Sequence, residues 1–380
     1  MKTNLKKLLC SGVTLMSLGV LAACSTASSS TTTSSSVATS QTSVATSSSS
    51  TSASSSSSSI DWSALPTTEV TLSNDGLKVT EGGTYILTGS TTAGVTVETD
   101  ANVRIILAGA DISSSDNAAI NVIKSDNVEL EIKDGTSNTV KDTSNHSDTN
   151  IEGAIHVEAD LTITGNGNLT VEGNFQDGIV STDDLVINAS DIKVTAVDDG
   201  IRGKDSLTIN GGTIDVTAGG DGLKSTNDTD TTKGYTRITG GDITVKAGDD
   251  AIKAETALTI DGGTITVPES LEALEGTNIT INGGTLDVYG SDDAINAAST
   301  TSTDIFIKVT GGDLKVAVGS GDTDAFDANG DIYISGGTID VTAPTSAFDF
   351  DGTAELTGGT VRVNGEQISQ IVATGPGARW

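Results

Sequence analysis

Cysteine is nearly absent from this chain, which has two in 380 residues. Cys10 and Cys24 both fall in an N-terminal segment with the features of a cleaved leader. The rest of the chain therefore has no thiol, which excludes disulfides, cysteine nucleophiles and cysteine metal ligands there. Histidine is equally rare. His146 lies in a polar insertion and His156 lies just after a repeated apolar residue, a placement that supports neither a catalytic triad nor a zinc site.

Proline, aromatic residues and helical patterning are also scarce. The chain has 4 Pro and 3% aromatic residues, and no window repeats apolar residues at the spacing of an amphipathic helix. So few rings leave little material for stacking against neutral sugars, and Phe326 and Phe348 are expected in the core. Tyr235 and Tyr289, near insertions and corners, are the remaining candidates for a stacking platform.

Positive charge is the third deficit. Lys and Arg together number 20 against 51 Asp and Glu, which gives a formal net charge of −31. A charge of this size disfavours nucleic acid and anionic lipid as electrostatic partners. It favours cations, and polymers that are neutral or bridged by cations.

The N-terminal segment indicates export. Three lysines precede a short apolar run at 8–20, and Leu-Ala-Ala-Cys follows, ending at Cys24. This ending resembles the lipobox of bacterial lipoproteins, so we expect 1–23 to be a signal peptide and Cys24 to carry lipid. The alternative is an ordinary cleaved signal with an incidental Cys.

Residues 24–59 continue as an almost unbroken Ser/Thr tract. Such a composition cannot bury enough apolar surface to offset its ordering entropy, so a disordered linker is expected. With the lipidated Cys24 it predicts a protein anchored on the extracellular face of the cell membrane, projecting into or through the wall. Membrane contact is expected through the lipid only.

A repeat organises the rest of the chain. An acidic residue, a small residue and an apolar anchor recur at intervals of 21 to 31 residues, most often 22. The anchors are Ile155, Ile179, Ile201, Leu223, Ile252, Leu274, Ile295, Phe326 and Phe348. A Gly-Gly marker recurs between them. Self-similarity at a fixed period is typical of solenoids.

Between the markers, apolar and polar residues alternate, as at Leu207–Asn210 and Ile214–Thr217. This is the pattern of short strands with one buried face. The sequence thus predicts an all-β, single-stranded parallel β-helix (a solenoid) of about ten or eleven rungs. We assign 60–119 to an N-terminal cap and first rungs, 120–363 to the regular coil, and 364–380 to a C-terminal cap or tail.

Long intervals come from polar insertions. "KSTNDTDTTKGY" follows Leu223 and "NAASTTSTD" follows Ile295, both between an anchor and its Gly-Gly marker. Insertions in the same leg of a coil project from the same side, and that side is often the one that binds.

The recurring acids predict a ladder along one edge. Adjacent carboxylates about 4.8 Å apart repel by roughly 3 kcal/mol at an effective dielectric of 20. Backbone N–H groups at the corner, neighbouring Lys and Arg, or bound calcium could offset this repulsion. We expect calcium at one or more positions, with corner capping and ion pairs as the alternative. The candidate ligands are Asp177, Asp198, Asp199, Asp221, Asp249, Asp250, Asp292 and Asp293, with a second group at Asp322, Asp324 and Asp327.

Several segments resemble a known family. They are "GTYILTGS", "VRIILAGADISSSDNAAINV", "VDDGIRGKDSLTINGGTIDVTAGGDGLKS" and the Lys-Gly-Tyr before the next Gly-Gly. Together, over about 65–365, they are similar to secreted carbohydrate-binding β-helix proteins of Gram-positive bacteria. The resemblance implies a right-handed β-helix related to family 9 polysaccharide lyases, bound calcium, and binding of cellulose or acidic sugars such as polygalacturonate.

These inferences favour a non-catalytic, polysaccharide-binding surface lipoprotein whose acidic face bears calcium. Candidate substrate contacts are the basic residues near the acids and one aromatic residue: Arg202, Lys204, Lys224, Lys253 and Tyr235. Two alternatives stay open. One is a calcium-dependent uronate lyase, which needs a Lys or Arg as base. The other is a structural or adhesive surface protein whose ladder serves stability only.

Overall fold

A computed structural model describes residues 60–188, 190–321 and 323–374. The signal peptide, Cys24, the Ser/Thr linker and Asp322 lie outside the described residues. The described residues all belong to one compact unit. The described part is all-β apart from a short 3₁₀ turn, η1 (Trp62–Ala64). None of the described helical segments is long and apolar enough to cross a membrane.

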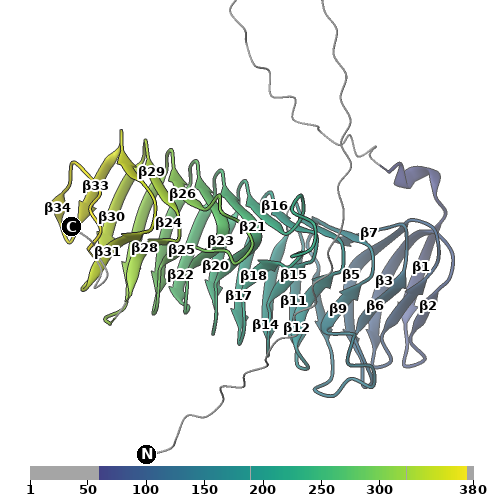
Figure 1. Cartoon of the computed structure of the whole chain (residues 1–380). Helices are drawn as coiled ribbons and strands as arrows, with labels where there is room; N and C mark the ends of the chain where they lie inside the picture. Colours follow the sequence, from purple (N-terminus) through teal and green to yellow (C-terminus); the bar gives the residue numbers. More distant parts are fainter. Residues whose placement is uncertain (1–59, 189, 322, 375–380) are drawn as a thin grey trace, which may run out of the picture. The chain divides into compact units, whose positions relative to one another are not determined.

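The strands form three stacks of parallel pairs (Figure 1). In the first stack each strand pairs with the corresponding strand of the next turn of the chain. Its members in spatial order are β1 (Thr67–Leu72), β3 (Gly83–Thr91), β5 (Val103–Ser113), β7 (Asn127–Ile132), β10 (Asp160–Gly165), β13 (Asp184–Ile187), β16 (Ser206–Ile209), β19 (Tyr235–Ile238), β21 (Ile252–Ile260), β23 (Leu274–Ile281), β26 (Phe306–Val309), β29 (Asp331–Ile334) and β32 (Ala354–Leu356).

The second stack begins in the C-terminal parts of β3 and β5, which pair at Gly89 with Ala110 and at Thr91 with Ile112. The same part of β5 pairs with β8. The stack ends at β33, where β34 (Glu366–Gln367) pairs in the antiparallel sense. After β5 the members of this stack, in spatial order, are β8 (Ser137–Lys141), β11 (Asn168–Gly173), β14 (Asp191–Ala196), β17 (Thr213–Ala218), β20 (Asp242–Lys246), β22 (Thr264–Glu269), β24 (Thr285–Gly290), β27 (Asp313–Val318), β30 (Thr338–Thr342) and β33 (Thr360–Val363).

The third stack contains the anchors. β21 and β23 are long enough to belong to it as well as to the first stack. Its other members are β2 (Leu77–Val79), β4 (Val95–Glu98), β6 (Ile120–Lys124), β9 (Gly153–Val157), β12 (Asp177–Ser181), β15 (Ile201–Gly203), β18 (Leu223–Ser225), β25 (Ile295–Ala297), β28 (Asp324–Ala328) and β31 (Ser346–Phe350).

The predicted stacking of anchors is confirmed by the register. Each anchor is the Cα partner of the next, from Ile155 opposite Ile179 through to Phe326 opposite Phe348. One passage of the chain through the stacks is called a rung below. The anchors are fully buried, and the rings of Phe326 and Phe348 stack with centroids 5.2 Å apart.

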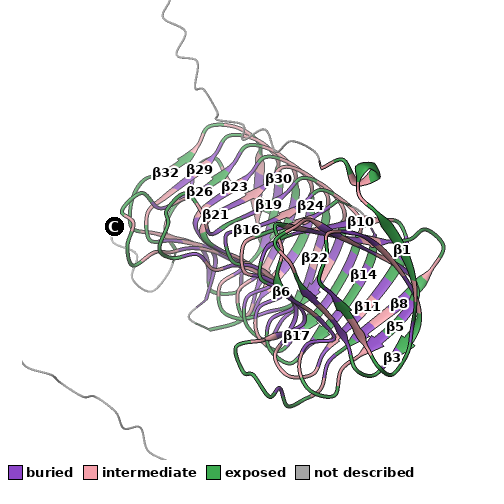
Figure 2. Cartoon of the chain, turned by 90° about the vertical axis from the view of Figure 1, so that its right-hand side faces the viewer, coloured by how far each residue is buried: buried purple, intermediate pink, exposed green. Residues whose placement is uncertain are grey.

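The core follows from the alternation seen in the sequence. Along β17 exposed and buried residues alternate without exception, with Ile214 and Val216 inside and Asp215 outside. Figure 2 shows the same alternation of buried and exposed positions on neighbouring strands. Because every rung repeats the pattern, the buried residues form one continuous apolar cluster.

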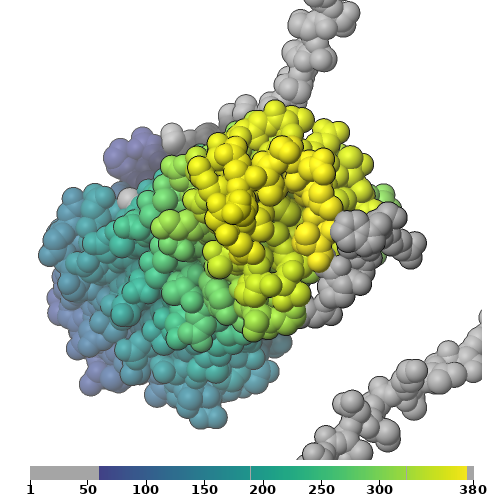
Figure 3. Space-filling view, turned by 90° about the vertical axis from the view of Figure 1, so that its left-hand side faces the viewer, coloured from purple at the N-terminus to yellow at the C-terminus, as the bar shows by residue number. Residues whose placement is uncertain are grey.

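Residues 364–374 pack on the last rung, at the end that faces the viewer in Figure 3. The two-residue strand β34 turns back on β33. Thr374 accepts a hydrogen bond from the Ala347 N–H at 3.0 Å, and its own N–H donates to the Phe348 carbonyl at 3.0 Å. These contacts occupy polar groups of β31 that no further parallel strand meets.

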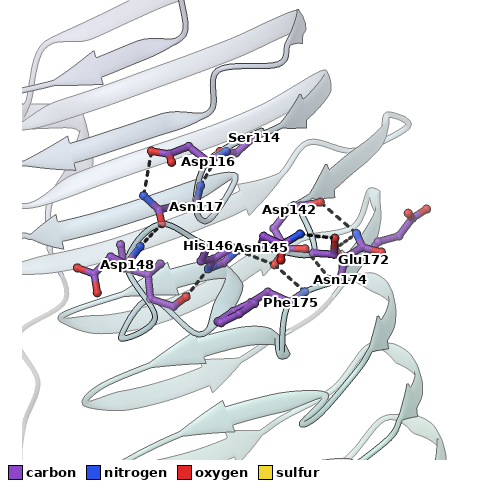
Figure 4. A network of polar contacts seen from close by, with 12 residues as sticks. Ser114, Asp116, Asn117, Asp142, Asn145, His146, Asp148, Glu172, Asn174 and Phe175 are labelled. Atoms are coloured by element: carbon purple, nitrogen blue, oxygen red, sulfur yellow. Dashed lines mark hydrogen bonds and ion pairs between the residues drawn. The ribbon is translucent and has the colours of Figure 1, made fainter.

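An insertion between β8 and β9 is held by a polar network (Figure 4). Both ring nitrogens of His146 face acceptors, the Asp142 carboxylate at 3.0 Å and the Ile151 carbonyl. Asp142 also accepts hydrogen bonds from the backbone N–H groups of Asn174 and Phe175. These contacts on both sides of the ring tie His146, and with it the insertion, to Asp142 and to the Ile151 carbonyl.

Candidate functional site

The acids two places before the anchors form a column, and four steps of it are tied by the same hydrogen bond. The N–H of Asp199 donates to Asp177 Oδ1 at 3.1 Å, and the N–H of Asp221 donates to Asp199 Oδ1 at 2.9 Å. The same bond links Asp250 to Asp221 at 3.0 Å, and Asp324 to Asp293 at 2.7 Å. One carboxylate oxygen of these acids therefore caps a backbone N–H of the following rung.

A second column stands one place after the anchors and supplies cations to the middle rungs. Arg202 pairs with Asp177 at 2.8 Å and also with Glu152. Lys224 pairs with Asp199 at 2.5 Å and with Asp221 at 3.0 Å. The predicted corner capping and ion pairing are thus both present in these rungs.

Lys253 holds the next pair of acids. Its ammonium lies 2.7 Å from Asp250 and also contacts Glu275. Burial alone would lower the pKa of Lys253, but its hydrogen bonds to these two carboxylates outweigh burial and the pKa is raised. Lys224 behaves in the same way: burial lowers its pKa, but the charges and hydrogen bonds of Asp221 and Asp199 together outweigh burial and the pKa is raised. Both amines are firmly protonated.

Beyond Lys253 the side chains of the second column are no longer positively charged. Its next members are Glu275, Asn296, Asp327 and Asp349 in place of cations. Burial and the charge of Asp250 raise the pKa of Glu272 to about 7. Burial and the charges of Asp293 and Asp324 raise the pKa of Asp327 to about 7. Among the described residues, neither Glu272 nor Asp327 has a Lys or Arg partner.

Two groups of carboxylates come close enough to share a cation. Asp221, Asp249 and Asp250 offer oxygens within 4.8 Å of one another, and so do Asp250, Glu272 and Glu275. Asn296 lies beside the second group and donates to both oxygens of Glu272 at 3.0 Å. Its own Oδ1 is buried and accepts no hydrogen bond. Carboxylate and amide oxygens at this density are ligands that calcium prefers, so these residues fit the ion.

The remaining predicted ligands lie in two settings. Asp198, Asp249 and Asp292 are exposed neighbours of the first column. Asp293 and Asp324 belong to the C-terminal part of the first column, and Asp327 belongs to that of the second. Sequence reasoning missed Glu275 and Asn296 as candidate ligands. Their signal was available, because they occupy the same position after the anchor as Arg202, Lys224 and Lys253.

His156 also stands in the second column, two rungs before Arg202. It is 3% exposed and its Nδ1 accepts and donates no hydrogen bond. Burial, followed by the charge of Arg202, lowers its pKa to about 4. The second column therefore has a neutral ring at His156, before the rungs in which Arg202, Lys224 and Lys253 pair with acids.

A groove opens on another side of the same rungs. It has a volume of about 720 Å³, within the range of small-molecule sites. Tyr235 lines it, with 37% of its surface exposed. Lys204 is exposed but does not line this groove. The structure therefore separates Tyr235 from the charged residues with which it was grouped as a substrate contact.

Comparisons with known proteins agree on a coarse function. A family model described as carbohydrate-binding domain-containing protein matches residues 73–325. A protein of the same description from Acetivibrio thermocellus is 30% identical over 135 residues, covering 33% of this chain. The match takes in 47% of that protein, so the chain spans about half the length of the curated relative.

A solved structure is also similar. It is described as the polysaccharide lyase-like protein from C. thermocellum, in a gadolinium derivative. The two share 32% sequence identity with a TM-score of 0.51, over 53% of this chain and 90% of the other.

Proposed function

The chain belongs to the family of carbohydrate-binding domain-containing proteins, and from this premise we propose that it binds acidic polysaccharide without cleaving it. Calcium held by the acidic face would join the protein to the sugar carboxylates. This proposal rests on one observation: in the C-terminal part of the two columns, the carboxylates outnumber the Lys and Arg side chains that pair with them.

Charge balance supports a metal ion there. Asp250 and Glu275 share one ammonium, that of Lys253, and Glu272 beside them pairs with no cation among the described residues. When all three carboxylates are ionised, they and the one cation leave a net charge of about −2 in a setting that screens poorly. Burial and this crowding of charge raise the pKa of Glu272 to about 7 and also raise the pKa of Asp250. A divalent cation of the oxygen-seeking kind neutralises this excess.

The same balance explains why sugar carboxylates would need the ion. Arg202, Lys224 and Lys253 are already paired with the protein's own acids, so they have little charge left for a polyanion. Calcium supplies open coordination positions to an incoming carboxylate when it is bound. The residues of the column hold the ion, and the bare acidic face keeps a polyanion away in its absence.

The lyase-like neighbour favours one alternative, a calcium-dependent uronate lyase. Such an enzyme needs a basic group that is unprotonated when it removes the proton beside the sugar carboxylate. The raised pKa values of Lys224, Lys253 and Arg202 make all three poor bases. We therefore prefer binding to catalysis.

Three further features complete the proposal. The stacks wind as a right-handed β-helix, the usual hand of parallel crossovers. The chain is exported and anchored by lipid at Cys24. The Ser/Thr tract carries the binding unit away from the membrane. Anchoring is tested by metabolic labelling with a radioactive fatty acid, which Cys24→Ala should abolish; labelling that survives the substitution would contradict it.

Calorimetric titration of the purified protein with polygalacturonate tests the function. We expect saturable heat with calcium and none in chelator. Glu272→Gln should reduce the calcium-dependent heat strongly, whereas the exposed Glu158→Gln should leave it unchanged. Heat that continues after each injection would mean turnover and would favour the lyase. Equal binding in calcium and in chelator would contradict the role of the ion.

A further inference from the structure

We propose that the groove beside Tyr235 is a second glycan site, independent of calcium, which takes an oligosaccharide carrying free amino groups. The site goes beyond the proposed function, because it shares no ligand residue with the Asp250–Glu272–Glu275 group and favours the opposite ligand charge.

The groove is built by the two insertions predicted to project from one side. The first, 226–234, joins β18 to β19, and the second, 298–305, joins β25 to β26. The rungs between them, β21 and β23, pass the same corner without an insertion. Rungs are about 4.8 Å apart, so two walls roughly 14 Å apart enclose a floor of two bare rungs.

The first wall is fixed by its own hydrogen bonds. Asn227 is 7% exposed and accepts the N–H groups of Thr229 and Asp230. Asp230 in turn accepts the N–H and the hydroxyl of Thr232, at 3.0 and 2.7 Å. In the second wall, Ser299 accepts the N–H groups of Thr301 and Ser302. Walls ordered in this way lower the entropy cost of binding.

The floor offers the groups that recognise sugar hydroxyls. Thr256, Thr259 and Thr277 line it together with Asn278 and Asn282. The hydroxyls of Thr256 and Thr277 donate to backbone carbonyls, so their oxygens are what they offer a ligand, as acceptors. Tyr235 and Ala257 add an aromatic ring and a methyl group, which suit the apolar face of a sugar ring. The chemistry is that of a shallow saccharide site, with short hydroxyl and amide side chains and one ring.

The charge of the lining selects among saccharides. Asp228, Asp230, Glu255 and Asp261 line the groove against a single cation, Arg237, a balance of four negative charges to one positive. Arg237 is occupied by Asp261, with its Nε at 2.9 Å. Among the described residues, Asp228, Asp230 and Glu255 make no ion pair. A uronate is therefore repelled, while an ammonium group gains charge-assisted hydrogen bonds.

The pKa values of the acids agree with this choice. Hydrogen bonds from Thr232 lower the pKa of Asp230, and the hydrogen bond from Asn282 lowers that of Asp261. Both stay ionised in mildly acidic solution, where amino sugars are protonated. The ring of Tyr235 adds a cation–π contact for an ammonium placed over it.

The test compares a glucosamine oligomer with its fully N-acetylated form of the same length, in chelator and at mildly acidic pH. We expect saturable binding of the glucosamine form, weakened about tenfold or more by N-acetylation. The double variant Asp228→Asn/Glu255→Gln should weaken it by a similar factor, and Tyr235→Ala should weaken it severalfold. Equal binding of the two oligomers, or no binding of either, would overturn the proposal.

A matched control tests whether the glucosamine oligomer is simply attracted to the overall negative charge of the protein, which is −31. Asp191→Asn/Asp242→Asn changes the net charge by the same amount at two exposed positions in β14 and β20, away from the groove lining. This variant should bind as tightly as the parent; a loss equal to that of the groove variant would contradict a defined site. Because the groove variants should keep calcium-dependent polygalacturonate binding, failure here is distinguishable from failure of the proposed function.

Discussion

At the scale of single residues, Lys224 is the side chain on which the acidic column depends most directly. It lies between Asp199 and Asp221, and the three side chains are 19%, 10% and 6% exposed. Removing one partner of a buried pair costs more than the pair contributes, because the other charge stays buried. We expect Lys224→Met to lower the free energy of unfolding by about 3 kcal/mol, measured by chemical denaturation.

An exposed lysine provides the comparison. Lys315 lies 3.4 Å from Asp287, and both side chains are more than half exposed. Lys315→Met should change the free energy of unfolding by less than about 0.5 kcal/mol. If both substitutions cost the same, burial of the column would not be the reason for the larger effect.

His156 permits a direct reading of one buried group. The chain has 2 His, so each imidazole can be followed by NMR. Burial and Arg202 lower the pKa of His156 to about 4, below the value near 6.5 of an unfolded chain. The neutral ring therefore contributes stability above about pH 6.5, which is lost as the pH falls toward 4. A midpoint for His156 near 6.5 would contradict its burial beside Arg202.

At the scale of elements, the small residue before each anchor is a packing constraint. At Gly222 a Cβ would lie 2.1 Å from Val245 Cγ1 and 2.6 Å from the Ala251 carbonyl oxygen. Gly222→Ala should therefore cost about 2 kcal/mol or more, seen as a lower midpoint of thermal unfolding. The repeat alone would suggest that Ala is tolerated at this position, because Ala251 and Ala273 occupy it in the next rungs.

Gly276 is the control for this prediction. The nearest atom to a Cβ there is the Ala254 carbonyl oxygen at 3.3 Å, so only a small adjustment is needed. Gly276→Ala should be several times milder than Gly222→Ala. Similar losses would indicate that backbone entropy, not contact with Val245, governs both sites.

The acidic column also sets a pH dependence. In chelator, Glu272 has a pKa of about 7 in the folded protein against 4.5 in the unfolded chain. Between these values the folded state binds more protons, so stability falls as the pH rises. Allowing for solvent screening at a partly exposed group, Glu272 contributes about 1–2 kcal/mol to this fall.

The measurement compares the parent with Glu272→Gln in chelator from about pH 5 to pH 8. The variant should lose less stability over this range, because its side chain does not titrate. Calcium should stabilise the parent more at the upper end of the range than at the lower end. Parallel curves for the two proteins would contradict the raised pKa of Glu272.

Sequence patterns predicted the elements better than their charge balance. The anchors at Ile201 and Leu223 could be placed opposite each other because the repeat fixes the register. The sequence did not show which acids Arg202 neutralises or which acids Glu275 adds its charge to. That depends on which residues of the neighbouring rungs face each other. The sequence predicted that the two insertions project from the same side, but it did not predict the groove. The groove has a floor because β21 and β23, which lie between the insertions, have none.

At the scale of the whole molecule, the C-terminal segment limits the stack. The strand β34 runs antiparallel to β33, and Thr374 occupies polar groups of β31. A chain ending at Val363 would leave these strands with open edges, and exposed edges pair with one another. We expect this truncated protein to form end-to-end oligomers, measured by light scattering after size-exclusion chromatography. A stable monomer would mean that the edge is already protected by its charge.

The stack also decides how the molecule carries force. Neighbouring rungs pair as parallel strands, so the hydrogen bonds between them run along the direction in which the strands follow one another in Figure 1. A pull along that direction therefore loads these hydrogen bonds directly. A ligand seated between 226–234 and 298–305 would pass tension to the N-terminal side through the rungs from β1 to β25 only. The rungs from β28 onward would stay unloaded. Under flow or traction, the weakest interface between β1 and the groove would set the breaking strength of the whole attachment.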